Sequence, residues 1–331
     1  MSLLMTGATG LVGGMLLEHA REQPVLAIAR RAMPRGPNVK PNVKTVTGDL
    51  ADPTFSLAAY QNDVTEIIHC AAAVRFDLSL ADARAINTHA TGRLLDFARR
   101  APRLRKFTHV STVYVMGNDE GTLPEAPYQA RSYPNTYEQS KAEAETLVLA
   151  AAKDLPVQIV RLSSIAGHAR TGVVTQFNHV HQLLKLFPRR ILPVAPGHAD
   201  IPVDLIAEDW TVPSLWHLHQ RTFAAGSIAH LSAGPGAAIR LADLFAICAE
   251  VYECPPPKLI PLAEFERVMH SRLGGLLMEA LGLFLPHLGR DQSFLNAQTL
   301  ARIPAPPPTV DSFLPAIVRY CHVGERELVA R

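Results

Sequence analysis

A glycine-rich stretch near the amino terminus constrains the fold of this chain more than any other feature. Residues 6–13 read TGATGLVG; they follow the apolar residues 3–5 and open into a segment with helical spacing. A strand, a glycine turn and a helix in this order form the geometry that binds the pyrophosphate of a dinucleotide. The glycines permit a tight turn, and the helix N-terminus offers unpaired N–H groups and a positive dipole end. A turn between two buried elements is the simpler alternative.

The composition argues against several classes of protein. The chain has 331 residues, 48% hydrophobic and 19% charged, which is typical of a folded protein with one large domain or two lobes. A net charge of +2 does not indicate binding to nucleic acid or to an anionic membrane. We expect no secretory signal, because the first residues run directly into the glycine motif. No apolar run is long enough to span a membrane.

Cysteine and histidine usage indicates neither a disulfide framework nor a metal site. The cysteines are Cys70, Cys248, Cys254 and Cys321, with no CxxC pair among them. We expect buried thiols in a reducing compartment and therefore a cytoplasmic protein. His217 and His219 flank a leucine without an acidic or cysteine partner nearby, so no metal ligation is predicted.

The end of the second predicted strand bears on the choice of cofactor. Residues 24–29 read PVLAIA, as in a buried parallel strand, and are followed by Arg30 and Arg31. An acidic residue at this position binds the ribose 2′-hydroxyl of NAD, whereas arginine suits the 2′-phosphate of NADP. The sequence therefore favours NADPH, with NADH less expected. A solvated basic turn is the alternative role for the two arginines.

The third and fourth predicted strands also end in residues suited to a ligand. Residues 43–47 alternate and lead into GDL, where Asp49 could accept a hydrogen bond from the adenine amine or cap the next helix. Residues 66–73 form a strand that runs into three alanines. Small side chains at the carboxyl end of a strand leave room for a ligand across the sheet edge.

The remaining elements complete a doubly wound α/β pattern. Further strands are predicted at 106–114, 156–162 and 227–231, a strand–helix unit at 201–209, and helices at 80–100 and 135–152. Alternating strands and helices imply a parallel sheet. The loop at 117–135, without predicted structure of its own, is of the kind that is often functional. We predict a Rossmann lobe of residues 1–165 and 201–235, and a smaller, mostly helical substrate lobe of residues 166–200 and 236–331.

Tyr137 and Lys141 are the candidates for proton transfer. They are four residues apart at the start of a predicted helix, so both side chains lie on one face. An ammonium group nearby would lower the pKa of the phenol and make it a usable proton donor. Thr112, at the end of the fifth strand, is the first candidate to hold a substrate carbonyl oxygen, and Ser111 is the second. A YxxxK pair is common by chance; its value here comes from the glycine turn and the Ser-Thr strand end that precede it.

Five motifs resemble those of the extended short-chain dehydrogenase/reductase superfamily. They are TGATGLVG, GDL at 48–50, HCAAAVRFD at 69–77, HVSTVYV at 109–115 and YEQSK at 137–141. More narrowly, the HxAAxVxFD and STxYV forms, YEQSKAEAE, GHARTG at 167–172 and IPVDLIAED at 201–209 are similar to the thioester reductase and fatty acyl-CoA reductase branch. The match extends from Met1 to about residue 233.

The resemblance implies a catalytic triad of Thr112, Tyr137 and Lys141 and NADPH as the cofactor. The implied cofactor-binding set is Thr6, Gly7, Thr9, Gly10, Leu11, Val12, Gly13, Arg30, Arg31, Asp49, Leu50, Ala71, Ala72, Ala73, Tyr137, Lys141, Leu162, Ser164 and Ile165. Members of this branch reduce acyl thioesters, carried by coenzyme A or a carrier protein, to aldehydes or alcohols. One departure is RLSSI at 161–165, where the branch usually has an Arg-Pro-Ser-Ile-type sequence at the nicotinamide end of the pocket.

Two other functions compete with a reductase. A nucleotide-sugar epimerase or dehydratase on the same fold would normally keep NAD, and Arg30 together with the few polar residues of the C-terminal lobe argues against it. A dinucleotide sensor would not need Thr112, Tyr137 and Lys141. The apolar residues 273–288 could line an acyl channel or fill a core. The sequence fits a monomer or a homodimer equally.

Overall fold

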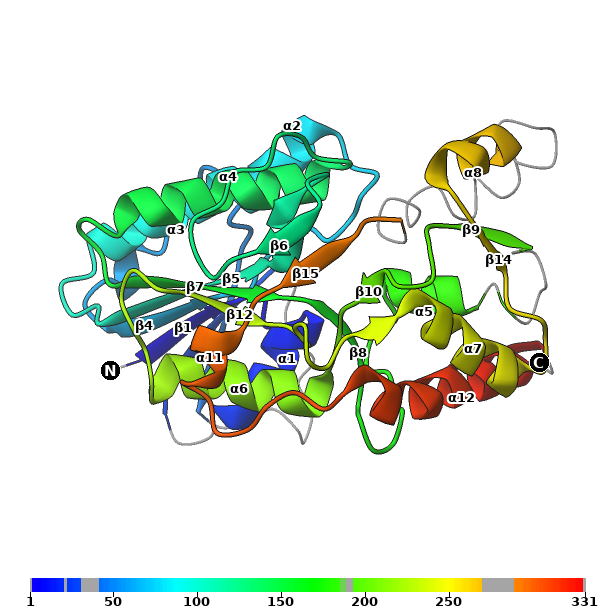
Figure 1. The fold of residues 1–331 in the computed structure, drawn as a ribbon. Coiled ribbons are helices and arrows are strands. Elements are labelled where there is room, and N and C mark those ends of the chain that lie inside the picture. Colours follow the sequence, from blue (N-terminus) through cyan, green and yellow to red (C-terminus); the bar gives the residue numbers. More distant parts are fainter. Residues whose placement is uncertain are drawn as a thin grey trace.

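A seven-stranded parallel sheet forms the centre of the larger part of the molecule in a computed structural model (Figure 1). The structure describes residues 2–20, 23–30, 42–185, 187, 193–269 and 289–329. In spatial order the strands are β12 (Ile228–Leu231), β7 (Val157–Leu162), β5 (Lys106–Thr112), β4 (Val64–His69), β1 (Ser2–Thr6), β2 (Val25–Ala29) and β3 (Val43–Thr47). All six strand pairs are parallel.

The order of the strands locates the ligand-binding edge of the sheet. From β1 the chain adds β2 and β3 on one side, then returns to add β4, β5, β7 and β12 on the other. The reversal falls between β1 and β4, and ligands of open parallel sheets bind at the carboxyl ends of the strands at such a point. The predicted doubly wound fold is confirmed.

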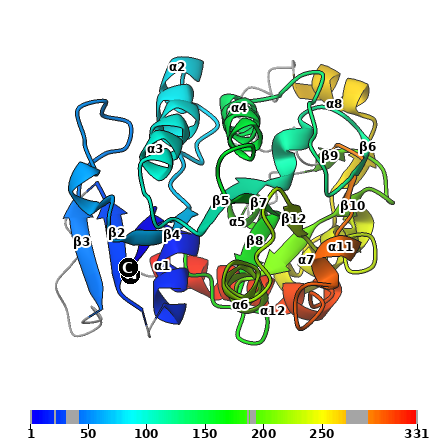
Figure 2. The same cartoon turned by 90° about the vertical axis from the view of Figure 1, so that its left-hand side faces the viewer.

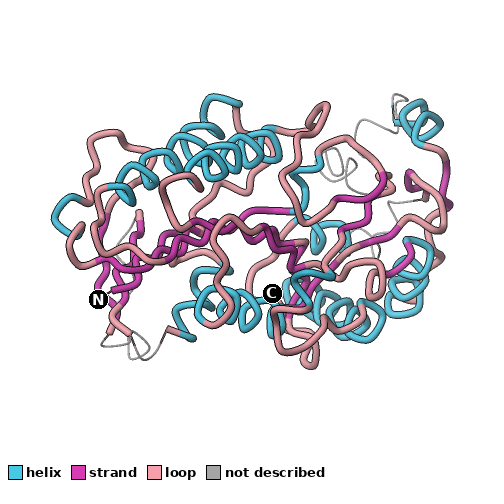
Figure 3. The backbone as a smooth tube through the Cα atoms, turned by 60° about the vertical axis from the view of Figure 1, so that its left-hand side comes forward, coloured by secondary structure: helices cyan, strands magenta, loops and turns pink. Residues whose placement is uncertain are grey.

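Helices cover both faces of the sheet, as Figures 2 and 3 show. One layer holds α2 (Leu80–Ala83), η2 (Arg84–His89), α3 (Ala90–Arg99) and α4 (Thr136–Ala151); the other holds α1 (Leu11–His19) and α6 (Glu208–Gln220). Most of the strands are buried on both faces because both faces are covered. All five residues of β2, for example, are buried. Leu4 and Phe107 pack under one layer and Leu3 and Ile68 under the other.

The predicted helix at 80–100 is interrupted by one π-helical segment. Its first turn is capped by Ser79, whose hydroxyl accepts a hydrogen bond from the Asp82 N–H at 3.1 Å. Residues Arg84–His89 then follow π geometry before α3 resumes. Short π segments inside helices are frequent at functional sites. Asn87, which is buried in this segment, makes contacts that are described with the site below.

The smaller part of the molecule is built around its own apolar core. Its elements are β8 (Ser164–Gly167), α5 (His179–Leu184), β9 (Val194–Pro196), β10 (Pro202–Val203), β11 (Leu205–Ala207), β13 (Ile239–Arg240), α7 (Leu241–Tyr252), β14 (Lys258–Ile260), α8 (Leu262–Met269) and α12 (Val310–Val329). Leu244 and Phe245 of α7 pack with Phe313 and Ile317 of α12. The predicted acyl-channel segment 273–288 lies outside the described residues.

One C-terminal segment packs on the sheet rather than on the smaller core. It comprises β15 (Gln292–Phe294), α11 (Ala297–Leu300) and the residues that follow. Ile303 joins the core under α6, and the Trp210 Nε1–H donates to the Ala305 carbonyl oxygen at 3.0 Å. The chain therefore passes to the sheet and back to the smaller part, two crossings more than the predicted division implies, and that division stays a prediction.

The predicted unstructured loop at 117–135 is organised by this same segment. A short helix η3 (Val113–Met116) follows β5, and β6 (Gly121–Leu123) pairs in parallel with β15. A three-residue strand has no periodicity that a sequence could reveal, and its partner lies far along the chain.

A further short helix is η1 (Ala58–Tyr60). No helix within the described residues is long and apolar enough to cross a membrane.

Candidate active site

The glycine turn between β1 and α1 forms an open cradle. Gly7 has φ of +70°, which favours glycine, and a Cβ on Gly13 would lie 2.2 Å from the Gly7 carbonyl oxygen. The backbone therefore requires both residues. A Cβ on Gly10 would meet only that same oxygen, at 3.4 Å. The space beside Gly10 is free, as the approach of a pyrophosphate to the backbone requires.

The N-terminus of α1 also suits a phosphate, because its first N–H groups are uncapped. Gly10 is the N-cap; no side chain caps the helix, and no acidic residue lies in its first turn. The first helical bond runs from the Gly14 N–H to the Gly10 carbonyl oxygen at 2.8 Å. The N–H groups of Leu11, Val12 and Gly13 precede that bond and are therefore the ones an anion would find unpaired. The residues present thus fit a dinucleotide.

Thr6 connects the glycine turn to the end of β4. Its side chain is buried; Oγ1 lies 2.7 Å from His69 Nδ1 and accepts a hydrogen bond from the Ala71 N–H at 3.1 Å. This residue, predicted to contact the cofactor, has its hydroxyl committed to the fold. It aligns the turn with the half-buried alanines at 71–73, where the nicotinamide half is predicted to lie.

Asn87 holds the other side of the alanine segment. Its Oδ1 accepts from the Ala73 N–H at 2.8 Å, while Nδ2 donates to the Ala73 carbonyl oxygen at 3.2 Å and to Ser140 Oγ at 2.9 Å. Ser140 lies on α4 between Tyr137 and Lys141, so Asn87 ties the catalytic helix to the strand end. Sequence reasoning gave Asn87 no role in the site; an asparagine in mid-helix was the one signal for it.

The residues predicted to bind the adenosine half lie at the ends of β2 and β3. Arg30 is exposed, while Arg31 lies outside the described residues. Asp49 Oδ1 accepts a hydrogen bond from the Ala51 N–H at 2.8 Å within a turn. The alternative that Asp49 caps a helix is wrong, because no helix begins between residues 49 and 57. The Leu50 carbonyl oxygen accepts from Arg93 Nε at 2.7 Å. Contacts of Arg30 and Asp49 with a cofactor stay predictions.

The predicted triad converges at the start of α4. Asn135 caps this helix: its Oδ1 accepts from the Glu138 N–H at 2.9 Å. Tyr137 and Lys141 follow on one face and are buried, as is Thr112 at the end of β5. Burial raises the pKa of Tyr137, and a hydrogen bond with the Thr112 hydroxyl opposes that rise. Ser111, the second candidate, has a buried hydroxyl without a partner among the described residues.

Lys141 is bound to β5 through its ammonium group. Its Nζ donates to the Val110 carbonyl oxygen at 2.8 Å and lies 3.3 Å from His109 Nε2. Burial lowers the pKa of Lys141 to about 8, against the opposing effects of Glu145 and Cys70. The pKa of Tyr137 is raised by burial. That the ammonium of Lys141 lowers this pKa stays a prediction.

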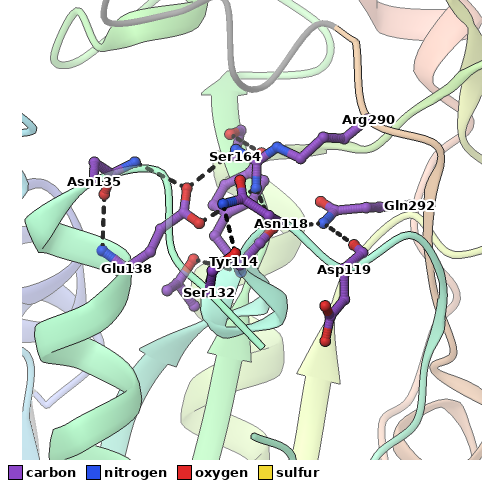
Figure 4. Close-up of polar contacts among 11 residues, drawn as sticks. Tyr114, Asn118, Asp119, Ser132, Asn135, Glu138, Ser164, Arg290 and Gln292 are labelled. Carbon is purple, nitrogen blue, oxygen red and sulfur yellow. Dashed lines mark hydrogen bonds and ion pairs between the residues drawn. The ribbon is translucent and has the colours of Figure 1, made fainter. Parts of the chain in front are cut away.

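A second polar cluster, which sequence reasoning missed, surrounds the residue after Tyr137 (Figure 4). The Glu138 carboxylate is fully buried and pairs with Arg290, with 3.3 Å between Oε1 and Nη2. Burial raises the pKa of Glu138, and Arg290 opposes that rise. Beside this pair the Tyr114 hydroxyl lies 2.7 Å from Ser164 Oγ. Nothing in the spacing of residues 138 and 290 could have predicted this contact.

The end of β7 completes the lining predicted for the nicotinamide. Leu162, Ser164 and Ile165 are all buried. The Ile165 carbonyl oxygen accepts from Asn178 Nδ2 at 2.7 Å, so the segment is braced by the N-cap of α5. No cluster of potential metal ligands occurs among the residues that the structure describes.

The strand order and the glycine cradle define a dinucleotide-binding protein of the Rossmann class, and comparison with known proteins places it within that class. The model of the male sterility protein family matches residues 20–215. The chain belongs to this family, and the resemblance to the thioester reductase and fatty acyl-CoA reductase branch of the extended short-chain dehydrogenases/reductases is confirmed.

Curated relatives include fatty acyl-CoA reductase 2 of Mus musculus. It is 28% identical over 284 residues, which cover 65% of this chain and 54% of that protein. The human fatty acyl-CoA reductase 2 is 27% identical, with 62% and 52% covered. The chain thus spans little more than half the length of the curated relatives it matches.

Solved structures share the fold across nearly the whole chain. The terminal R domain from the myxalamid PKS-NRPS biosynthetic pathway has a TM-score of 0.81 at 24% identity, with 99% of this chain and 91% of that chain covered. UDP-glucuronic acid 4-epimerase from Bacillus cereus, in complex with NAD, has a TM-score of 0.70 at 17% identity, with 98% and 99% covered. The chain therefore shares its fold with both of these proteins, and the epimerase structure holds NAD.

Proposed function

We propose that this protein is an NADPH-dependent reductase of acyl thioesters. The observation that carries the proposal is that Thr112, at the carboxyl end of β5, forms a hydrogen bond with Tyr137, which shares α4 with Lys141. The open cradle at Gly10 follows the carboxyl end of β1 in the same parallel sheet. The family membership and the named activity of the fatty acyl-CoA reductases support it.

Thr112 and Tyr137 have separate roles in the proposed reaction. When bound, the reduced nicotinamide supplies a hydride for the carbonyl carbon of the thioester. Thr112 holds the carbonyl oxygen beside the Tyr137 hydroxyl, which donates a proton to that oxygen. A phenol with a raised pKa keeps its proton at neutral pH, so Tyr137 is present as the acid that this step requires. Collapse of the resulting hemithioacetal expels the thiol and leaves an aldehyde.

We infer that Lys141 contributes its charge and its hydrogen bonds. With NADPH bound, the ammonium would bind the nicotinamide ribose and approach the phenol, which stabilises negative charge as Tyr137 gives up its proton. Loss of the Lys141 proton would remove that charge. The buried ammonium makes the site sensitive to pH near 8.

Selection of NADPH over NADH rests on Arg30. This guanidinium is exposed at the end of β2, where the 2′-phosphate of NADP would lie in a Rossmann fold. Arginine pairs with phosphate in a bidentate way, which a 2′-hydroxyl cannot match. Arg30→Ala is expected to weaken NADPH binding about tenfold or more while leaving NADH binding nearly unchanged.

The carrier and the cellular location belong to the same proposal. The acyl group would arrive on coenzyme A or on a carrier protein, as expected for this branch. The four cysteines are free thiols, consistent with the cytoplasmic location expected from the sequence.

One set of assays tests the proposal against the epimerase alternative, which the NAD-bound structural neighbours keep in view. Purified protein is mixed with NADPH or NADH and with acyl-CoA, aldehyde or UDP-sugar substrates, and the absorbance of the reduced nicotinamide is followed. We expect oxidation of NADPH by acyl-CoA, and loss of it in Tyr137→Phe with NADPH binding retained. Cofactor binding without oxidation by any carbonyl would contradict the proposal. Conversion of a UDP-sugar without net oxidation would favour the epimerase.

A further inference from the structure

Lys141 lies in a buried pocket formed by groups from three elements. From β5 it meets His109 and the Val110 carbonyl oxygen. From β4 and its end it faces His69 and Cys70, and from its own helix Glu145. The Glu145 carboxylate is already bound to Arg161, with 2.7 Å between Oε2 and Nη2. The direct acceptors of the ammonium within the described residues are therefore two neutral groups, a carbonyl oxygen and an imidazole.

His69 is already fully committed to other partners. The Thr91 hydroxyl donates to the Asn87 carbonyl oxygen at 2.6 Å, so His69 Nε2 must donate its proton to Thr91 Oγ1, at 2.9 Å. His69 Nδ1 is then an acceptor, and the Thr6 hydroxyl donates to it at 2.7 Å. Both ring nitrogens of a neutral His69 are satisfied, so this ring is not available to Lys141.

His109, unlike His69, has a ring nitrogen without a hydrogen-bond partner among the described residues. It lies opposite His69 in the sheet, with ring centroids 5.3 Å apart, and it is completely buried. Its Nδ1 has no partner among the described residues, and its Nε2 contacts Lys141 Nζ. Leaving a ring nitrogen unpaired in the core costs free energy, so packing alone does not explain a histidine here.

We propose that His109 is a positioning residue for Lys141: its neutral Nε2 accepts a hydrogen bond from the ammonium, holds it against β5 and keeps it protonated in the working pH range. A hydrogen bond that accepts from the charged form of a base favours that form. Burial keeps His109 itself neutral, since it lowers the pKa of the ring well below its usual range, as does the nearby ammonium. The inference rests on the proposed function only in giving Lys141 a catalytic task.

The experiment is an NMR titration of lysine side chains in the full chain without cofactor or substrate. The protein has seven lysines, so spectra of the protein labelled with ¹³C at the lysine ε-carbon are simple, and Lys141→Met assigns the signal. In the wild type we expect a midpoint near 8. His109→Leu removes the acceptor and should lower the midpoint by about one pH unit or more. His109→Gln places an amide oxygen where Nε2 lies and should restore the wild-type value.

His69→Gln is the matched control, because it removes the neighbouring ring without removing a partner of Lys141. Its midpoint should stay within a few tenths of a unit of the wild type, and thermal melting of each variant reports whether it is folded. An unchanged midpoint in His109→Leu would overturn the proposal, as would equal shifts in His109→Leu and His109→Gln. If His109→Leu does not fold, a midpoint in His109→Gln equal to that of the wild type supports the proposal, and a lowered one contradicts it.

Activity is read separately. If the protein reduces thioesters, the alkaline limb of kcat/KM should move to lower pH in His109→Leu and return in His109→Gln. A midpoint that shifts as expected in a protein that reduces no thioester would refute the proposed function and leave the role of His109 intact. If the protein reduces thioesters but the Lys141 midpoint is unaltered in His109→Leu, the proposed function stands and the role of His109 is refuted.

Discussion

Two buried cations lie close together at α4, and they are held in different ways. Arg161 of β7 is completely buried and pairs with Glu145, with 2.7 Å between Nη2 and Oε2. It also donates to the Ala126 carbonyl oxygen at 3.1 Å and lies 3.1 Å from His230 Nε2. Lys141, one turn before Glu145, has two neutral acceptors and no carboxylate bound to it among the described residues.

The difference separates a cation of the fold from a cation of the site. A buried charge is tolerated when a countercharge and hydrogen bonds satisfy it, as for Arg161, which fastens the 117–135 segment to the sheet. A buried ammonium without a countercharge is costly, and such groups gather at functional sites. The same helix face thus supplies a carboxylate for structure and leaves the lysine available for a ligand.

The largest expected effect is on turnover, at the lysine. Lys141→Met should lower kcat by about 10²–10⁴-fold, because charge stabilisation at Tyr137 is lost. The free energy of unfolding should stay the same or rise, since an uncompensated buried charge is removed. Steady-state kinetics and urea denaturation of the same preparation measure both. If Lys141→Met were strongly destabilised, Lys141 would stabilise the fold as Arg161 does, which would contradict the proposed difference between them.

The next largest expected effect is on the free energy of unfolding when Arg161 is replaced. Arg161→Met should lower the free energy of unfolding by about 3–5 kcal/mol, because Glu145 is left buried without its partner. Replacing both, in Arg161→Met with Glu145→Leu, should recover much of that loss. Urea denaturation of the single and double variants measures this. If the single change costs less than about 1 kcal/mol, the pair is not what holds the segment.

Gly13 and Gly10 in the glycine turn offer the same contrast between a residue needed for the fold and a residue needed for the site. Gly13→Ala places a Cβ 2.2 Å from a backbone oxygen and should cost about 1–3 kcal/mol of stability. Gly10→Ala, with 3.4 Å to its nearest atom, should leave stability nearly unchanged and weaken NADPH binding about tenfold. Thermal melting and fluorescence titration with NADPH separate the two. Tight NADPH binding by Gly10→Ala would place the pyrophosphate elsewhere.

The smallest effect is the pH dependence of stability. Lys141 has a pKa of about 8 in the folded chain and its ordinary value of 10.5 when unfolded, so the unfolded state binds the proton more tightly. Below pH 8 the cost of the buried charge is fully present, and it is relieved as pH rises from about 8 towards 10.5. Relative to Lys141→Met, the wild type should gain about 1 kcal/mol between pH 7 and pH 9. Parallel curves for the two proteins would show that Lys141 titrates normally.

Much of the fold and part of the site could be predicted from local patterns. The strands β1, β2, β3, β5 and β7 and the long helices have the apolar runs or periodicities that reveal them. Thr112, Tyr137 and Lys141 follow from short motifs whose positions at strand and helix ends are fixed by the topology. These features depend on residues close together in the chain.

Contacts between distant segments could not be predicted in this way. The pairing of β6 with β15 and the ion pair of Glu138 with Arg290 join positions over 150 residues apart, through three-residue strands without a pattern. The orientation of Lys141 towards His109 depends on which way an ammonium turns within a pocket. Spacing placed Lys141 beside Tyr137, but the acceptors on β5 decide where its charge lies.

The most direct test of the account is the release of thiol from an acyl-CoA. Reduction of a thioester to an aldehyde consumes one NADPH and frees one coenzyme A thiol, while reduction to the alcohol consumes two NADPH for each thiol. We predict that wild-type protein with NADPH releases thiol in one of these ratios and that Tyr137→Phe, still binding NADPH, releases almost none. NADPH oxidation without thiol release, or equal release by Tyr137→Phe, would contradict the assignment of this site to thioester reduction.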